Sequence, residues 1–142
     1  MSFVLDPSLA LSWYFEDERT PEADALLDRA AEIGAVVPAL WRLEIANGFQ
    51  NAIRRKRIDL AFRDIAIAQL ANMPIAVDPD TNIYAWTTTL HLADRFQLTP
   101  YDAAYLELAQ RRKLPLATLD QQLRAAGKAL GLELLGTRRE HR

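Results

Sequence analysis

The sequence of 142 residues contains no cysteine, only five glycines and only two histidines. The absence of cysteine excludes disulfides, thiolate metal ligands and cysteine nucleophiles, and agrees with a reducing compartment. The sequence has no glycine-rich phosphate loop, and the isolated His91 and His141 indicate neither a catalytic triad nor a zinc site. Any chemistry must therefore come from other oxygen or nitrogen groups.

Long hydrophobic runs are lacking as well. No segment approaches the roughly 20 apolar residues that span a bilayer, and Asp6 interrupts the first apolar run well short of a signal peptide. We therefore expect a cytoplasmic protein with no membrane contact. Half of the residues are hydrophobic, and this length supports one core but not two ordinary domains. We expect one domain over residues 1–136 and a disordered basic tail over residues 137–142.

Short apolar runs alternate with longer segments of helical periodicity. This alternation is typical of an α/β fold with a mainly parallel sheet covered by helices. A hydroxyl residue followed by proline marks two helix starts, at Thr20-Pro21 and Thr99-Pro100. The runs expected to form strands are 3–5, 35–37, 75–77, 114–119 and 132–135.

Three aspartates stand where such a sheet could place a site. Asp6 follows the first apolar run and Asp120 follows the fourth, and parallel sheets bind ligands beyond the carboxyl ends of their strands. Either residue could instead be only a helix N-cap. Asp102 is the third residue of the helix that begins after Thr99, where it could simply complete a capping box.

A fourth acid, Glu44, lies within a predicted helix, at the border of its apolar stripe. At about 100° per residue, that stripe consists of Trp41, Ile45, Phe49 and Ala52. An edge-exposed glutamate is the alternative to a site residue. Gathering four partly buried acids is costly unless a cation neutralises them or some take up protons. Oxygen ligands without cysteine or a histidine cluster select Mg²⁺ or Mn²⁺, which commonly act on phosphate esters.

The net charge of −2 argues against wholesale coating of nucleic acid but allows a local basic surface. Two dense basic runs, Arg54-Arg55-Lys56-Arg57 and Arg111-Arg112-Lys113, lie near the ends of predicted helices. They could contact RNA, or they could be solvated cations that complement the helix dipoles. Asp78 is interpreted as a turn residue and Glu107 as a surface residue. The possible RNA contacts are Arg54, Arg55, Lys56, Arg111, Arg112 and Lys113.

Four ordered motifs surround the acids and extend over nearly the whole chain. They are Val4-Leu5-Asp6-Pro7-Ser8, Leu43-Glu44-Ile45-Ala46-Asn47, Thr99-Pro100-Tyr101-Asp102-Ala103-Ala104-Tyr105 and Leu116-Ala117-Thr118-Leu119-Asp120. In order, spacing and context this set resembles the PIN-domain ribonuclease toxins of the VapC type, which belong to the type II VapBC toxin–antitoxin systems.

The resemblance implies a three-layer α/β/α sandwich with a short, mainly parallel sheet and an acidic pocket. It further implies a Mg²⁺- or Mn²⁺-dependent endoribonuclease that hydrolyses RNA with an activated water, forms a homodimer and is inhibited by a VapB-like antitoxin. Two residues match the hydroxyls that support the pocket in the family, Ser8 and Thr118. The residues that match the catalytic and metal-binding acids are Asp6, Glu44, Asp102 and Asp120.

Three other interpretations compete with this one. A phosphate-accepting receiver domain requires an acidic pair near the first strand and a late lysine, whereas Pro7-Ser8 and Thr118-Leu119-Asp120 stand there. A haloacid-dehalogenase phosphatase requires a second aspartate where Ser8 stands. The third is a PIN-like module that has lost its activity and only binds RNA or protein, and it predicts no stabilisation by Mg²⁺ or Mn²⁺.

Overall fold

The structure, a computed structural model, describes residues 2–137. At its centre is a parallel five-stranded sheet with the strand order β3-β2-β1-β4-β5. The first strand is therefore central, with β2 on one side and β4 on the other. All five predicted strands are confirmed, as β1 (Val4–Leu5), β2 (Ala35–Val37), β3 (Ile75–Val77), β4 (Leu116–Ala117) and β5 (Leu134–Leu135).

The fourth strand is shorter than the apolar run that predicted it. The run 114–119 contributes only Leu116–Ala117 to the sheet. The Thr118 backbone N–H still donates to the carbonyl oxygen of Leu135 in β5 at 3.2 Å, and beyond it the Thr118 side chain accepts a hydrogen bond from the backbone N–H of Asp120 at 3.0 Å, which turns the chain toward α8. The hydrophobic pattern therefore located the strand, while a local side-chain contact set its end.

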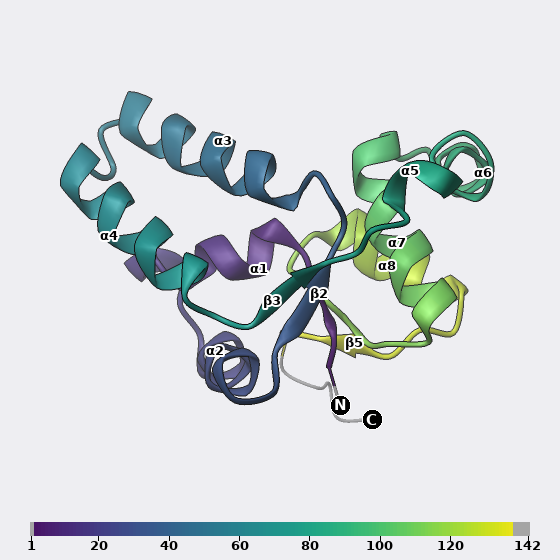
Figure 1. Cartoon of the computed structure of the whole chain (residues 1–142), viewed down its shortest axis with the longest axis horizontal. Helices are drawn as coiled ribbons and strands as arrows, with labels where there is room; N and C mark the ends of the chain where they lie inside the picture. Colours follow the sequence, from purple (N-terminus) through teal and green to yellow (C-terminus); the bar gives the residue numbers. More distant parts are fainter. Residues whose placement is uncertain (1, 138–142) are drawn as a thin grey trace.

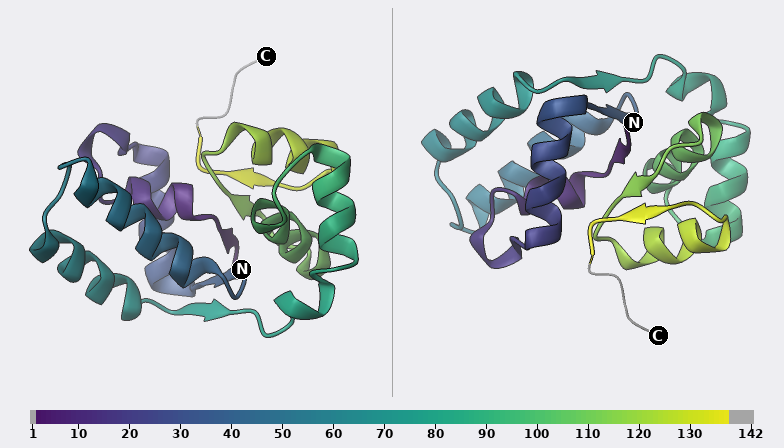
Figure 2. Two further views of the ribbon diagram at one scale, coloured as in Figure 1. Left: turned by 90° about the horizontal axis from the view of Figure 1, so that it is seen from above. Right: turned by 90° about the horizontal axis from the view of Figure 1, so that it is seen from below.

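Helices lie on both sides of the sheet, which confirms the predicted α/β/α arrangement. Figure 1 shows α3 and α4 extending together to one side, with α5 to α8 on the other. In the two views of Figure 2, the strands run between these groups of helices. The helical elements are α1 (Pro7–Ser12), η1 (Glu16–Glu18), α2 (Pro21–Ile33), α3 (Trp41–Arg54), α4 (Leu60–Ala71), α5 (Thr81–Tyr84), α6 (Thr88–Phe96), α7 (Pro100–Arg112) and α8 (Gln121–Ala129).

Helix α7 is the central helix of the fold. Every residue from 103 to 109 is buried, as expected for a helix covered on all sides. It packs against α6, α8 and β1. Its start is fixed by Thr99, whose Oγ1 accepts a hydrogen bond from the backbone N–H of Asp102 at 3.1 Å, and this N-cap matches the sequence prediction. Asp102 is thus carried on a rigid, buried element.

Two expectations concern the ends and the surroundings of the chain. Among residues 2–137, no helix is both long enough and apolar enough to cross a membrane. The basic tail predicted for residues 137–142 lies, apart from Thr137, outside the described residues. The domain boundary near residue 136 therefore stays a prediction.

Candidate active site

The carboxyl ends of β1 and β4 form the centre of the site. From β1 the chain adds β2 and then β3 on one side, and later adds β4 and β5 on the other. Neighbouring strands with connections in opposite directions create a switch point, where open parallel sheets bind ligands. Asp6 follows β1 at this point, and its backbone N–H donates to the carbonyl oxygen of Ala117 in β4 at 3.0 Å.

Asp6 is 4% exposed and is held through one of its two carboxylate oxygens. Its Oδ2 accepts hydrogen bonds from the Ser8 backbone N–H at 3.1 Å, the Ser8 hydroxyl at 2.5 Å and the Thr118 hydroxyl at 3.0 Å. Asp6 is also the N-cap of α1, so the structural and the functional interpretations are compatible. Within the described residues its Oδ1 accepts no hydrogen bond and stays available to a ligand.

The two hydroxyls also connect Asp6 to Asp120. The Oγ of Ser8 lies 3.2 Å from the Oγ1 of Thr118 and accepts from the backbone N–H of Leu119 at 3.0 Å. The Oδ1 of Asp120 caps α8 by accepting from the N–H of Leu123 at 2.9 Å. Asp120 is therefore fixed, like Asp6, through one carboxylate oxygen.

Glu44 approaches the same region from α3. The buried residues of this helix are the predicted apolar stripe, and Glu44 at its border is half-buried. Its Oε1 accepts a hydrogen bond from the hydroxyl of Tyr105 on α7 at 2.5 Å. From the sequence, Tyr105 was named only as the last residue of the motif around Asp102 and was given no role in the site. Its spacing was the missed signal, because Tyr105 follows Asp102 by three residues and shares its helix face.

The four acids affect one another electrostatically. The pKa of Asp6 is raised to about 6, because burial and, to a smaller extent, the Asp102 charge outweigh the lowering effect of the hydrogen bonds from Ser8 and Thr118. Burial also raises the pKa of Glu44 to about 6, with a contribution from the charges of Asp6 and Asp102. The pKa of Asp102 is raised by its own burial and by the charge of Asp120. Asp6, Glu44 and Asp102 are therefore each close enough to another of the four acids to be affected by its charge.

The carboxylate oxygens of the four acids are the kind of ligand that a hard divalent cation prefers, although they do not form a complete ligand shell. In the described part of the chain, no three Asp, Glu or His side chains stand in an arrangement ready to hold a metal. The acids nevertheless supply only oxygen, and Asp6, Glu44 and Asp120 each accept protein hydrogen bonds at one oxygen. None of the four forms an ion pair with a described lysine or arginine. This pattern suits Mg²⁺ or Mn²⁺.

Two of the predicted RNA contacts serve as structural cations. Arg111 donates to both oxygens of Asp78, at 2.7 and 3.2 Å, and to Glu107 at 2.6 Å. Arg112 donates to Asp78 at 2.8 Å. The interpretation of Glu107 as a surface residue is wrong, since it is 3% exposed. Asp78 accepts from the N–H of Asp80, as expected in a turn, but is itself buried.

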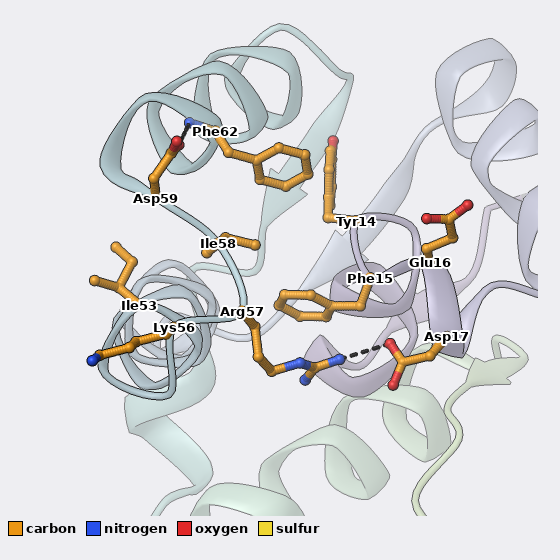
Figure 3. Close-up of a pocket in the computed structure, with 10 residues that line it drawn as sticks. All are labelled: Tyr14, Phe15, Glu16, Asp17, Ile53, Lys56, Arg57, Ile58, Asp59 and Phe62. Atoms are coloured by element: carbon orange, nitrogen blue, oxygen red, sulfur yellow. Dashed lines mark hydrogen bonds and ion pairs between the residues drawn. The ribbon is translucent and has the colours of Figure 1, made fainter.

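The other basic run, Arg54 to Arg57, begins at the last residue of α3 and continues into the loop before α4. Arg54 hydrogen-bonds Asn51. Lys56 and Arg57 border an open cavity of about 1060 Å³ that lies between η1 with the two residues before it, the α3–α4 loop and the start of α4. In Figure 3, Arg57 extends over Phe15 toward Asp17, whereas Lys56 points away from both. Arg55 and Lys113 are exposed. The six candidates therefore occupy different environments.

The Tyr105 contact leads to a prediction for Glu44. Tyr105→Phe keeps the buried ring but removes the hydroxyl that lowers the pKa of Glu44. We expect the pKa of Glu44 to rise above about 6 and the free energy of unfolding to fall by about 1 kcal/mol. Carboxyl-carbon NMR titration and urea unfolding of the metal-free protein measure both. Tyr101→Phe, at an exposed position of the same helix, is the control and should change neither.

Known proteins are similar to this chain in sequence and in fold. The family model described as PIN domain matches residues 3–129. The chain is 28% identical over 123 residues to Ribonuclease VapC3 of Pyrobaculum aerophilum, covering 87% of this chain and 92% of that protein. The crystal structure of PAE2754 from Pyrobaculum aerophilum is similar in fold, with a TM-score of 0.68 and 21% identity over 94% of this chain and 89% of that one. The resemblance seen in the sequence is confirmed, and the chain belongs to the PIN domain family.

Proposed function

We propose that this chain is a divalent-metal-dependent endoribonuclease and the toxin of a type II toxin–antitoxin pair. The observation that carries the proposal is the hydrogen-bond network that joins Asp6, Ser8 and Thr118 at the switch point of the sheet. Charge coupling connects this network to Glu44 and Asp102. The ribonuclease activity named for the similar VapC3 protein supports RNA as the substrate.

In this proposal, Asp6, Glu44, Asp102 and Asp120 would hold Mg²⁺ or Mn²⁺. When bound, such an ion lowers the pKa of water and neutralises charge on the phosphate that is attacked. Ser8 and Thr118 support the site by fixing the Asp6 carboxylate through Oδ2, so that Oδ1 faces the site with little freedom to rotate.

The metal requirement gives a direct test. We expect the protein to cut single-stranded RNA in Mg²⁺ or Mn²⁺ and to leave it intact in EDTA. Either ion should also raise Tm by several degrees, because a ligand at about 100 times its Kd stabilises the folded state by about 2.7 kcal/mol. End-mapping of the RNA and a thermal-shift titration measure these effects, with Ca²⁺-free buffer and EDTA as controls.

A PIN-like module that binds RNA or protein without cleaving it is the second candidate. The absence of an assembled three-acid group within residues 2–137 favours it. It predicts neither cleavage nor a rise in Tm with Mg²⁺ or Mn²⁺. That joint result would contradict the proposed enzyme.

The proposed partners follow from the same similarity. We infer that a VapB-like antitoxin binds this chain, that the chain forms a homodimer, and that both act in the cytoplasm. The name of the VapC3 relative supports the first of these inferences. Co-purification of the chain with the product of an adjacent small reading frame tests it.

A further inference from the structure

One face of α3 leads away from the acids. Glu44, Gly48, Asn51 and Arg55 follow one another at spacings of four, three and four residues, which places them on a single side of the helix. From Glu44 to Arg55 this stripe extends about 16 Å along the helix axis. It begins with an acid of the proposed site and ends with a cation.

A cavity of about 290 Å³ lies against this stripe. Gly48, Asn51 and Arg55 line it from α3, while Ser8 and Asp120 line it from the candidate active site. The cavity therefore borders the candidate active site at Asp120 and at Ser8, which holds Asp6, and it extends to Arg55. Its volume is at the lower end of ordinary ligand pockets, roughly 300–1,000 Å³, and suits a single nucleotide better than a folded segment.

The glycine at position 48 allows α1 to come close to α3 beside this cavity. A Cβ at Gly48 would collide with the Cδ1 of Leu11 on α1, and Leu11 also lines the cavity. At Gly48 the wall thus consists of helix backbone and the aliphatic side chain of Leu11 packed against it. Such a surface can receive a flat base without hydrogen-bonding its edges.

The cations near this cavity differ in how they are paired. Arg57, also in the lining, is neutralised by Asp17 at 2.8 Å and Glu18 at 3.2 Å (Figure 3 shows the first contact). The guanidinium of Arg55 has no hydrogen bond or ion pair with any described residue, and the residue is exposed. Of the described cations that line the cavity, Arg55 is therefore the one whose charge is not already balanced.

We propose that this cavity is the subsite for the RNA nucleotide next to the scissile bond, with Arg55 contacting its backbone phosphate. The inference rests on the proposed function for its substrate. It also gives the path of the bound RNA, which would run from the acids along α3 toward Arg55. A phosphate contact of this kind contributes affinity independent of base sequence.

RNA binding without cleavage tests this inference. A short fluorescein-labelled single-stranded RNA is titrated in EDTA and followed by fluorescence anisotropy. We expect Arg55→Ala to weaken binding about fivefold at 0.1 M salt and to reduce the slope of log K against log salt by about 0.7, the values for one phosphate contact with single-stranded RNA. Arg55→Lys should retain most of the binding, because it keeps the charge.

Arg42→Ala is the matched control, since Arg42 is an exposed arginine of the same helix that lines a different cavity, facing α4. Equal affinities and equal salt slopes for the wild type and Arg55→Ala would overturn the subsite, and so would the same loss in Arg42→Ala. Failure of the wild type to bind RNA overturns it too. Metal-dependent cleavage is assayed in parallel. Because Arg55 is not among the metal-binding acids, a protein that cleaves RNA but fails these binding tests contradicts only the subsite and not the proposed enzyme.

Discussion

Asp6→Asn is expected to reduce RNA cleavage by more than about a hundredfold. Loss of a residue that merely supports a metal ligand typically costs 10- to 100-fold in affinity or activity, and Asp6 is assigned as a ligand itself. Asparagine retains the shape of the side chain and the N-cap of α1, so the fold should persist. Cleavage of a labelled RNA in Mg²⁺ measures the loss.

The same substitution should stabilise the metal-free protein at pH 7. The pKa of Asp6 is raised to about 6 in the folded protein from 3.8, so the folded state holds this proton more tightly than the unfolded state. The stability that the group contributes is complete below about pH 4 and is lost as the pH rises through about 6. The substituted asparagine carries no charge, and the free energy of unfolding at pH 7 should increase by up to about 3 kcal/mol.

Urea unfolding in EDTA at pH 5 and pH 7 measures this effect. The wild type should lose stability between the two values, and Asp6→Asn should lose less. Asp102→Asn provides a comparison, with the same loss of cleavage and a smaller gain in stability because it is less buried. An Asp6→Asn protein that folds and cleaves RNA at the wild-type rate would contradict the assignment of the site.

Arg111→Met is expected to lower the free energy of unfolding by about 3 kcal/mol. Arg111 bridges two buried acids, Asp78 and Glu107, and removing one partner of a buried ion pair typically costs 3–5 kcal/mol. Burial raises the pKa of Asp78, but the hydrogen bonds from Arg111 and Arg112 outweigh this effect and lower it. Without Arg111, Glu107 would be left without its cation and Asp78 with only one.

The midpoint of urea unfolding at pH 7 measures the loss. Arg112→Met should cost less, because Arg112 makes one contact with Asp78 and is more exposed. Lys113→Met, in the same basic run, has no side-chain partner among the described residues to lose and should be close to neutral. Equal stability of Arg111→Met and the wild type would show that the cluster contributes nothing to the fold.

The order of strands and helices could be predicted because it depends on local patterns. Each strand coincides with an apolar run, and the helix starts at Thr20 and Thr99 follow from N-cap chemistry. The candidate acids could also be found, since Asp6 directly follows β1 and Asp120 directly follows the fourth apolar run, which contains β4. Their metal-binding role stays a prediction, because side-chain proximity alone does not establish a ligand shell.

The pairs between distant side chains could not be predicted. Tyr105 and Glu44 are 61 positions apart, and Arg111 and Asp78 are 33 apart. Nothing in either local sequence specifies the partner, because the contact depends on how α7 packs against the rest of the molecule. The basic runs were ambiguous for the same reason. Whether an arginine is a structural cation or faces a cavity depends on acids elsewhere in the chain.

The central position of β1 also determines when the site can form during synthesis. Asp6 is translated before Thr118, its hydroxyl partner, which lies 112 positions later. Until β4 has been translated, β1 has one unpaired edge and the Asp6 carboxylate lacks that hydrogen bond. A nascent chain therefore cannot build this carboxylate environment before β4 has been translated, and fragments that stop short of β4 cannot build it at all.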